Sequence, residues 1–585
     1  MRKLILTTTS AILTILLASI IYLSNYGIKT DNFNTFINNK VKDYNSNLTL
    51  KLDDVFIKLN LTQASFNINT ENAILIANNN SLKILNIDIN LNALKFIKKK
   101  SSIKNIKIET SENSIKDLTS LLNSINYDLS RFIFYSQIKN GMIKFKLDTK
   151  FNSNEDKIDS YTISGKIKDA KFNLVGNSSL DNINFNFKAK DKLTKISNLN
   201  FRYQDLNLLS KSIEIKNEGS GIYYINGDIE NDKALINPNI IFKLVNIKQD
   251  FLSKTDISLK SKNLFSFSLK KYKLKNLKID SVINFDEVYF SNKYQNLVFL
   301  KEGTINSKYE NNQFNADLVS NFAFSDNFKI KNDYKNNNLE INLKGKKNQI
   351  IKINGNISNK KILVDPKIFL NLFKLDPNLL SEGNVNIETD NKFTFEIQNS
   401  KLKNYLINST IDLDKLQLNK KIQDILYLKN IKTKLTFGDK LLKLDLKSNY
   451  SLLDKNNGES DNNIINLKLN KSGPKISDVE ILLKGENNKI NTKKLKKYIN
   501  FQEDFLRDQN IKLDTNSLIN FSIDDKLNIK KLAIRSDLNL DNLNINYKSN
   551  LIKKYLKNYE NKLIIKKSNI LLDYSNDIIN LKLDG

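Results

Sequence analysis

The 585-residue chain has no cysteine, histidine or tryptophan, and it has little glycine (16) or proline (4). Without cysteine no disulfide can form, and without both cysteine and histidine no Cys/His metal site is possible. The same absences exclude a nucleophile–histidine pair, and no glycine-rich GxxxxGK[ST] phosphate loop occurs. Scarce glycine and proline also argue against collagen-like and Gly/Pro-rich disordered chains. We therefore expect no enzymatic activity, no bound metal and no cofactor.

The chain is strongly basic, with 92 Lys and Arg against 63 Asp and Glu, a formal charge of +29. Such a charge invites binding to nucleic acid or to an anionic membrane. The lysines, however, are spread over the predicted strands and turns and do not gather on one basic helix or tail. We therefore expect a solvated polar face and no nucleic-acid partner, with a role near acidic lipid head groups left open.

The amino terminus carries the sharpest local signal. Arg2 and Lys3 precede 20 residues without a charge, from Leu4 to Leu23. At about 1.5 Å rise per residue, a helix of this length matches the hydrocarbon thickness of a bilayer. The basic flank predicts a cytoplasmic amino terminus, with everything after Tyr26 across the membrane. The predicted anchor residues are Leu4, Ile12, Leu16, Ile20 and Leu23.

A cleaved signal peptide is the alternative interpretation of the same segment. The apolar stretch is longer than the usual core of a signal peptide, and no A-x-A cleavage site follows it. These features favour an uncleaved single-pass anchor.

Beyond the anchor, most of the chain alternates apolar and polar residues. In residues 85–91, LNIDINL, every second side chain is apolar, which is typical of an antiparallel strand with one dry and one wet face. About 15 residues per strand and turn give on the order of 30–35 strands. We expect the apolar positions of these strands to share one face: Ile57, Leu59, Leu61, Leu85, Ile87, Ile89, Leu91, Phe185, Phe187, Phe265 and Phe267.

A few stretches break this rhythm and predict short helices. Phe33, Phe36, Ile37 and Val41 have helical spacing, with Thr30-Asp31 as the expected cap. Ile115, Leu118, Leu122 and Ile125 also have helical spacing, and further helices are expected from Pro366 and near 493–508. The near copies NIINLKLN (463–470) and DIINLKLD (577–584) compete with chance similarity in so biased a composition.

The patterns together predict the following organisation: a cytoplasmic tip and transmembrane anchor (1–26), a helix and strand region (27–130), a long sheet (131–452), a linker (453–463) and a continuation of the sheet (464–585).

A sheet with so many strands has three ways to treat its dry face. It can pair as stacked sandwiches, but few turn glycines and prolines and no core tryptophan argue against them. It can close as an outer-membrane barrel, which the apolar anchor and the non-aromatic end Leu583-Asp584-Gly585 argue against. It can also curl into a trough whose dry wall is filled by something apolar, and lipid tails suit such a wall. We favour a mainly β fold in which one N-terminal transmembrane helix precedes a long curled antiparallel sheet, an elongated groove with a few short helices.

The order of elements resembles a known family. The anchor, the short helix and the segment ILNIDINLNALKFIKKKSSIKNIKIETSENSIKDL are similar to the amino-terminal region of the bacterial AsmA-like family, which includes AsmA, TamB and YhdP. This match covers about residues 1–130, and the later strands resemble the repeating β-groove of that family and of bridge-like lipid transfer proteins.

The resemblance implies a protein anchored in the bacterial inner membrane, with its bulk in the periplasm. It implies that phospholipid binds the alternating apolar set as groove lining and is conducted between the inner and outer membranes. The expected partners are phospholipids and the inner membrane, followed by the outer membrane or its assembly proteins. The alternatives are a scaffold or assembly factor for outer-membrane proteins and a membrane-tethered adhesin of β-sandwiches.

Overall fold

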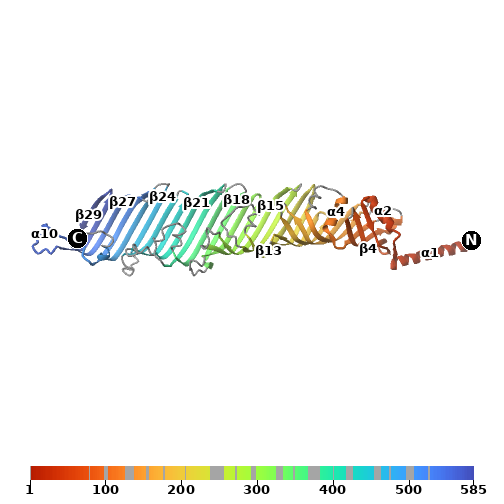
Figure 1. The fold of residues 1–585 in the computed structure, drawn as a ribbon, viewed down its shortest axis with the longest axis horizontal. Helices are drawn as coiled ribbons and strands as arrows, with labels where there is room; N and C mark the ends of the chain where they lie inside the picture. Colours follow the sequence, from red (N-terminus) through yellow and green to blue (C-terminus); the bar gives the residue numbers. More distant parts are fainter. Residues whose placement is uncertain are drawn as a thin grey trace. The chain divides into compact units, whose positions relative to one another are not determined.

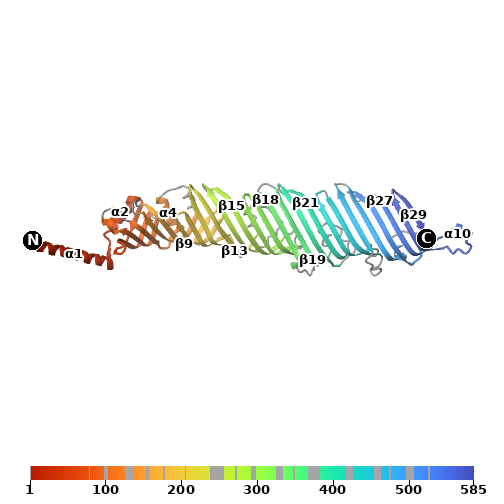
Figure 2. The ribbon, with the colours of Figure 1, turned by 180° about the vertical axis from the view of Figure 1, so that it is seen from behind.

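The computed structural model is mainly β and contains one long antiparallel sheet, which confirms the predicted fold class (Figures 1 and 2). Within the described residues the sheet has 29 strands and is not closed on itself. The described residues are 2–77, 80–97, 103–125, 137–152, 157–174, 178–204, 206–237, 256–270, 273–290, 298–324, 334–346, 350–365, 383–398, 401–416, 426–439, 441–452, 463–472, 476–495, 506–524 and 528–584.

Unit 1 is the first of two compact units and comprises Met1–Ile236, Ser258–Ile283 and Lys308–Asn311. From β8 to β13 each strand pairs with the next one in the chain; before that, β3 pairs with β1 and β4, β2 with β4, and β6 with β5 and β8. Its elements are α1 (Arg2–Asn25), β1 (Ile28–Thr30), α2 (Asn34–Tyr44), β2 (Leu48–Lys51), β3 (Val55–Asn60), β4 (Ser65–Ala77), β5 (Asn80–Asn92), α3 (Ala93–Ile97), β6 (Ile103–Thr110), β7 (Asn113–Ser114), α4 (Ile115–Ile125), β8 (Ile138–Phe151), β9 (Ile158–Asn173), β10 (Ser179–Lys190), β11 (Leu193–Tyr203), β12 (Leu206–Gly219), β13 (Ile222–Ile236), β14 (Ile257–Lys270) and most of β15 (Lys273–Tyr289).

Unit 2 comprises Asn237–Ile257, Asn284–Ser307 and Asn312–Gly585. From β17 to β29 each strand pairs antiparallel with the next, so this part of the sheet is a meander. Its elements are most of β16 (Val298–Glu310), β17 (Gln313–Phe324), the 3₁₀ turn η2 (Tyr334–Asn336), β18 (Asn337–Lys346), β19 (Ile351–Val364), β20 (Val385–Gln398), β21 (Lys401–Leu416), β22 (Leu426–Gly438), β23 (Leu441–Leu452), β24 (Ile464–Ser472), β25 (Ile476–Asn491), α9 (Thr492–Leu495), β26 (Asn510–Asp524), β27 (Ile529–Asn546), α10 (Asn550–Tyr555), β28 (Lys562–Ser575) and β29 (Ile578–Asp584).

The pairing of consecutive strands in one sheet differs from the predicted alternative of stacked sandwiches. In a sandwich the chain alternates between two sheets, commonly through Greek-key connections. From β8 to β13 in unit 1 and from β17 to β29 in unit 2 the strands pair in chain order, as the colour gradient shows (Figures 1 and 2). All the described strands belong to this one sheet, so they supply no second sheet that could pair with its dry face.

The two helices predicted near the start of the sheet are present, with changes in detail. α4 spans Ile115–Ile125, but it buries Leu121, while Leu122 of the predicted face is 41% exposed. α2 spans Asn34–Tyr44, and its N-cap residue is Phe33, which makes no side-chain capping bond. The predicted Thr30-Asp31 cap is therefore wrong. The helix predicted from Pro366, most of the helix near 493–508 and all but Asn463 of the linker 453–463 lie outside the described residues.

Many strands contain a non-glycine residue with a positive φ angle. Such left-handed residues interrupt the regular pairing and accompany shifts in register, as β-bulges do. Asparagine and aspartate adopt this conformation more readily than other non-glycine residues. The Asn and Asp examples inside strands are Asn72, Asp169, Asn182, Asn198, Asn276, Asn404, Asn430 and Asn487.

Candidate functional site: the apolar face of the sheet

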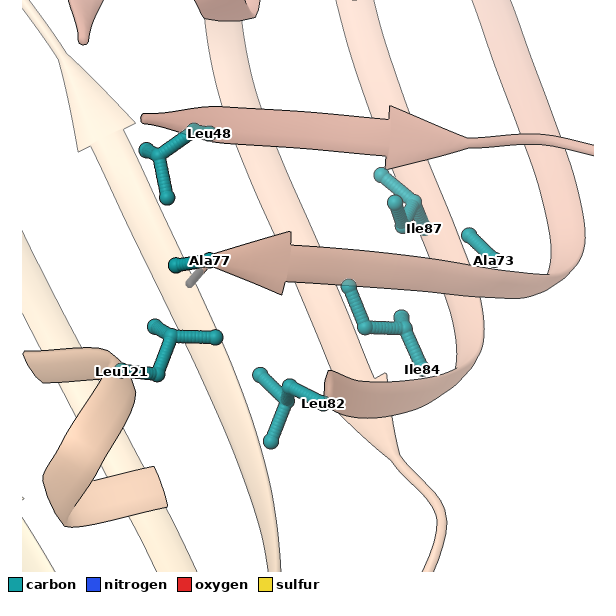
Figure 3. Close-up of a cluster of buried hydrophobic side chains, with 7 residues drawn as sticks. All are labelled: Leu48, Ala73, Ala77, Leu82, Ile84, Ile87 and Leu121. Atoms are coloured by element: carbon teal, nitrogen blue, oxygen red, sulfur yellow. The ribbon is translucent and has the colours of Figure 1, made fainter. Parts of the chain in front are cut away.

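The first strands of unit 1 carry a self-packed core. Buried side chains of β2, β4 and β5 contact Leu121 of α4 (Figure 3). Ile87 belongs to this core with only 8% of its surface exposed, and Ile89 packs against it. The predicted lining residues Ile87 and Ile89 are therefore packed together under the protein's own helix, which is the ordinary role of a strand core.

Leu85 does not share the face of Ile87, although the alternation predicts that it should. Ile84 pairs with Thr110 and Asn86 pairs with Glu109, so Leu85 is an extra residue in β5. Such a bulge exchanges the two faces of a strand. Ile84 consequently lies in the same core as Ile87, while Leu85 is 40% exposed.

The other predicted lining residues divide into three groups. Ile57 and Leu59 are half-buried in β3, Leu91 is buried at the end of β5, and Leu61 lies beyond β3 with 55% of its surface exposed. Phe185 and Phe187 form a ring pair in β10, and Phe265 and Phe267 form another in β14, with ring centroids 6.2 and 6.0 Å apart. Contact of any of these residues with lipid stays a prediction.

Replacement of Ile87 by Asp is expected to destabilise the protein itself. A carboxylate there has no cationic partner within the core, so burying it costs several kcal/mol, on the order of 3–5 by analogy with broken buried pairs. The measurement is the midpoint of thermal unfolding of the Ile87→Asp variant, with Leu85→Asp as the neighbouring exposed control. An unchanged midpoint for Ile87→Asp would contradict the packed core.

An apolar row begins beside the α4 core, where Phe145 and Phe187 pack against buried residues that include Ile115 of α4, and it continues across unit 1. Its members face one another in register on β8 to β13: Phe145, Gly165, Phe187, Ile196, Ile213 and Gly227. A Cβ atom on Gly165 would lie 2.7 Å from Cζ of Phe187, and one on Gly227 would lie 3.0 Å from Cζ of Phe265. Each phenylalanine ring therefore lies over a glycine and occupies the space that a Cβ atom at that position would take. Only glycine permits this close approach.

In unit 2 a second row crosses seven adjacent strands without a polar interruption. Its members are in register from β23 to β29: Leu446, Leu467, Ile481, Ile519, Ile534, Tyr574 and Ile579. Each is partly exposed, and Ile579 is 66% exposed. No helix of the described residues packs on this row in the way that α4 packs on β5 and β8. In each unit we call the sheet face that carries its row the apolar face.

The opposite, polar face is hollowed and rich in lysine. One hollow in unit 1, of about 840 Å³, is lined mainly by lysine, serine and asparagine, and Phe187 also borders it. Lys144 and Lys146 lie 3.1 and 2.8 Å from the carboxylate oxygens of Glu109. These hydrogen bonds hold the pKa of the Glu109 carboxyl below its usual value. A smaller hollow of about 400 Å³ borders Phe265 and is otherwise mostly polar.

The sequence contains a long internal repeat whose two copies carry corresponding strands. Residues 222–324 align with 350–452 without a gap at a constant offset of 128 residues, for example from Asn231 to Asn359, and 32 of the 103 aligned pairs are identical. The left-handed positions recur at the same offset, at Asn276 and Asn404. So much identity over an ungapped stretch exceeds what composition bias produces, so the five strands from β13 to β17 form a module that recurs as β19 to β23.

The repeat preserves a polar trio inside the apolar face. In unit 1, the Asn231 side chain donates to the carbonyl of Leu259 at 2.9 Å, and the Asn263 side chain donates to the carbonyl of Ile229 at 3.0 Å. The Ser261 hydroxyl joins the two amides. The trio lies close to the left-handed Lys233, and its side-chain amides satisfy two backbone carbonyls of the neighbouring strands.

The equivalent trio in unit 2 has the same bonds. Asn359 donates to the carbonyl of Ile387 at 2.9 Å and Asn391 donates to that of Ile357 at 3.0 Å, with Thr389 between them. The left-handed residue is again a lysine, Lys361. Sequence reasoning missed these residues because it searched for polar groups that bind ligands. The 128-residue offset would have found them.

The amino-terminal helix matches the predicted anchor. α1 spans Arg2–Asn25 and contains all five predicted anchor residues, and the 20 residues Leu6–Asn25 are long and apolar enough to cross a membrane as a span or to serve as a signal sequence. Thr7 donates to the carbonyl of Lys3 at 2.9 Å and Thr14 to that of Ser10 at 2.8 Å. The hydroxyls are thus satisfied inside the helix, as a hydrocarbon environment requires.

No family model, curated protein or solved structure matches the chain.

Proposed function

We propose that this protein is a membrane-anchored lipid conduit, in which acyl chains cover the apolar face of the sheet. The observation that carries the proposal is the unit 2 row from Leu446 to Ile579. It crosses seven adjacent strands, stays partly exposed and has no covering helix among the described residues. On a protein in water, partly exposed apolar surface of this extent marks an interaction site.

The chemistry of the occupant follows from the shape of the surface. The row consists of six branched aliphatic side chains and Tyr574, whose hydroxyl donates to Asp577 at 2.9 Å. It offers apolar contact along a line, which suits a hydrocarbon chain. At about 0.8 kcal/mol per buried CH₂, a 16-carbon chain contributes on the order of 10 kcal/mol before ordering costs. The open edge of the face leaves a polar head group in water.

The proposed location follows from α1 and its flank. With Arg2 and Lys3 held in the cytoplasm, α1 is a single-pass span of a bacterial inner membrane and the sheet lies in the periplasm. The resemblance of residues 1–130 to AsmA-like proteins supports this location. In this proposal phospholipid passes along the apolar face between the inner and outer membranes, and the protein performs no chemical step on it.

Photo-crosslinking in native membranes tests the proposal. A photoreactive residue at Ile481 or Ile519, on the apolar face, is expected to capture phospholipid detectable by mass spectrometry. Leu482 and Leu518 are matched controls, because each follows or precedes a row residue on the same strand and points to the polar face. Equal labelling of both faces, or none at Ile481 and Ile519, would reject the conduit.

A further inference from the structure

The loop between β27 and β28, residues 547–561, is an ordered projection that carries α10. Tyr547 donates its backbone N–H to the carbonyl of Asn561 at 2.9 Å, and the Tyr559 hydroxyl donates to the carbonyl of Tyr547 at 2.6 Å. Ser549 caps α10 by accepting from the N–H of Ile552. We call this segment the α10 loop. It extends beyond the neighbouring strands of unit 2 in both views (Figures 1 and 2).

The α10 loop exposes large apolar side chains. Leu551 and Tyr555 lie one turn apart on the same side of α10 and are 71% and 75% exposed, and Leu556 follows with 62%. The described part of α10 has no buried residue. The connection of β27 to β28 does not require three large apolar side chains exposed to water.

The same loop is strongly basic. Lys548, Lys553, Lys554 and Lys557 are all exposed, and Glu560 is its one acidic residue. Leucine and tyrosine flanked by lysines match the boundary of an anionic bilayer, where aromatic rings lie at head-group depth and lysine side chains extend to the phosphates. A protein partner with the same fit would have to present an acidic rim around an apolar pocket, a narrower requirement.

We infer that the α10 loop docks on an anionic membrane surface, with Leu551, Tyr555 and Leu556 inserted at the head-group boundary and the lysines on lipid phosphates. This contact is separate from α1, which lies in unit 1. It does not depend on lipid passing along the apolar face, because it needs only the exposed loop.

Vesicle flotation tests the docking with the full-length chain, whose α1 is held in a nanodisc of phosphatidylcholine. Vesicles of phosphatidylcholine with phosphatidylglycerol are expected to float the protein, and vesicles of phosphatidylcholine alone are not. The triple variant Leu551→Ser/Tyr555→Ser/Leu556→Ser is expected to lose flotation. Leu264→Ser and Val319→Ser, at residues 50% and 52% exposed elsewhere, are expected to keep it.

A lysine pair separates docking from general attraction by a basic protein. Lys553→Gln/Lys554→Gln is expected to weaken binding about 25-fold, since a lysine at an anionic surface contributes about 1 kcal/mol and 1.4 kcal/mol is tenfold. Lys432→Gln/Lys434→Gln removes the same charge from β22 and is expected to change binding little. Equal loss in the two pairs, unchanged flotation of the triple variant, or no flotation with any vesicle would each overturn the inference. Circular dichroism of every variant checks that the sheet is intact.

Discussion

Deletion of residues 225–352 is expected to leave a folded, lipid-binding protein that no longer moves lipid between two membranes. The deletion removes one 128-residue period and joins Tyr224 to Ile353. β12, which pairs with Ile225 and Gly227, then meets Ile353 and Gly355 in the same register. Because each strand contacts mainly its neighbours, the remaining strands keep their partners, as in other repeat proteins.

The loss of transport follows from length alone. Six strands at about 4.8 Å spacing extend the sheet by roughly 29 Å. We expect a conduit shortened by this distance not to reach both membranes. Lipid capture at Ile481, far along the chain from the deletion, is expected to persist. Transfer of fluorescent phospholipid between donor and acceptor membranes, measured beside crosslinking at Ile481, separates the two effects.

A deletion shorter by one residue is the matched control. Removing 225–351 joins Tyr224 to Lys352 and shifts the register by one, which moves every following side chain of that strand to the opposite face. This variant is expected to misfold or to unfold at a much lower temperature. Similar stability of the two deletions would contradict the repeated module, and full transport by the 128-residue deletion would contradict a conduit of required length.

Replacement of Ile481 by Asp is expected to reduce lipid transfer at least tenfold while the sheet stays folded. Ile481 lies in the middle of the unit 2 row and is partly exposed, so an empty apolar face lets water reach the carboxylate. Once an acyl chain covers it, the charge loses water at a cost of several kcal/mol, and each 1.4 kcal/mol is a factor of ten. The passing lipid is therefore destabilised and the free protein is not.

Leu482→Asp is the control for this substitution, because it adds the same charge to the next residue of β25 on the polar face. It is expected to transfer lipid normally. Ile431→Asp is the opposite reference: Ile431 is 1% exposed and packed with Leu428 and Tyr450, so its variant is expected to unfold. Normal transfer by Ile481→Asp would contradict the passage of lipid over the row. Unfolding comparable with that of Ile431→Asp would show that the row packs on protein.

The alternation of residue types predicted the strands and the antiparallel sheet, and the uncharged apolar run from Leu4 to Leu23 predicted the amino-terminal helix, because both signals are local in the sequence. It failed where a single residue changes the period. Leu85 looks equivalent to Ile87 in the sequence, yet the bulge in β5 separates their faces. The burial of Ile87 depends on its packing in the core that α4 covers. This is a tertiary contact, which the sequence of β5 alone does not indicate.

Many left-handed positions inside strands are places where this chain uses asparagine or aspartate and not glycine. Asparagine allows positive φ, as glycine does, but it restricts the unfolded backbone more than glycine. By the size of glycine substitutions at compatible sites, each such choice spares roughly 0.4–1 kcal/mol of chain entropy on folding. A meander with bulges in so many strands is therefore built from a stiffer chain, and it starts from a denatured ensemble that has fewer conformations to lose.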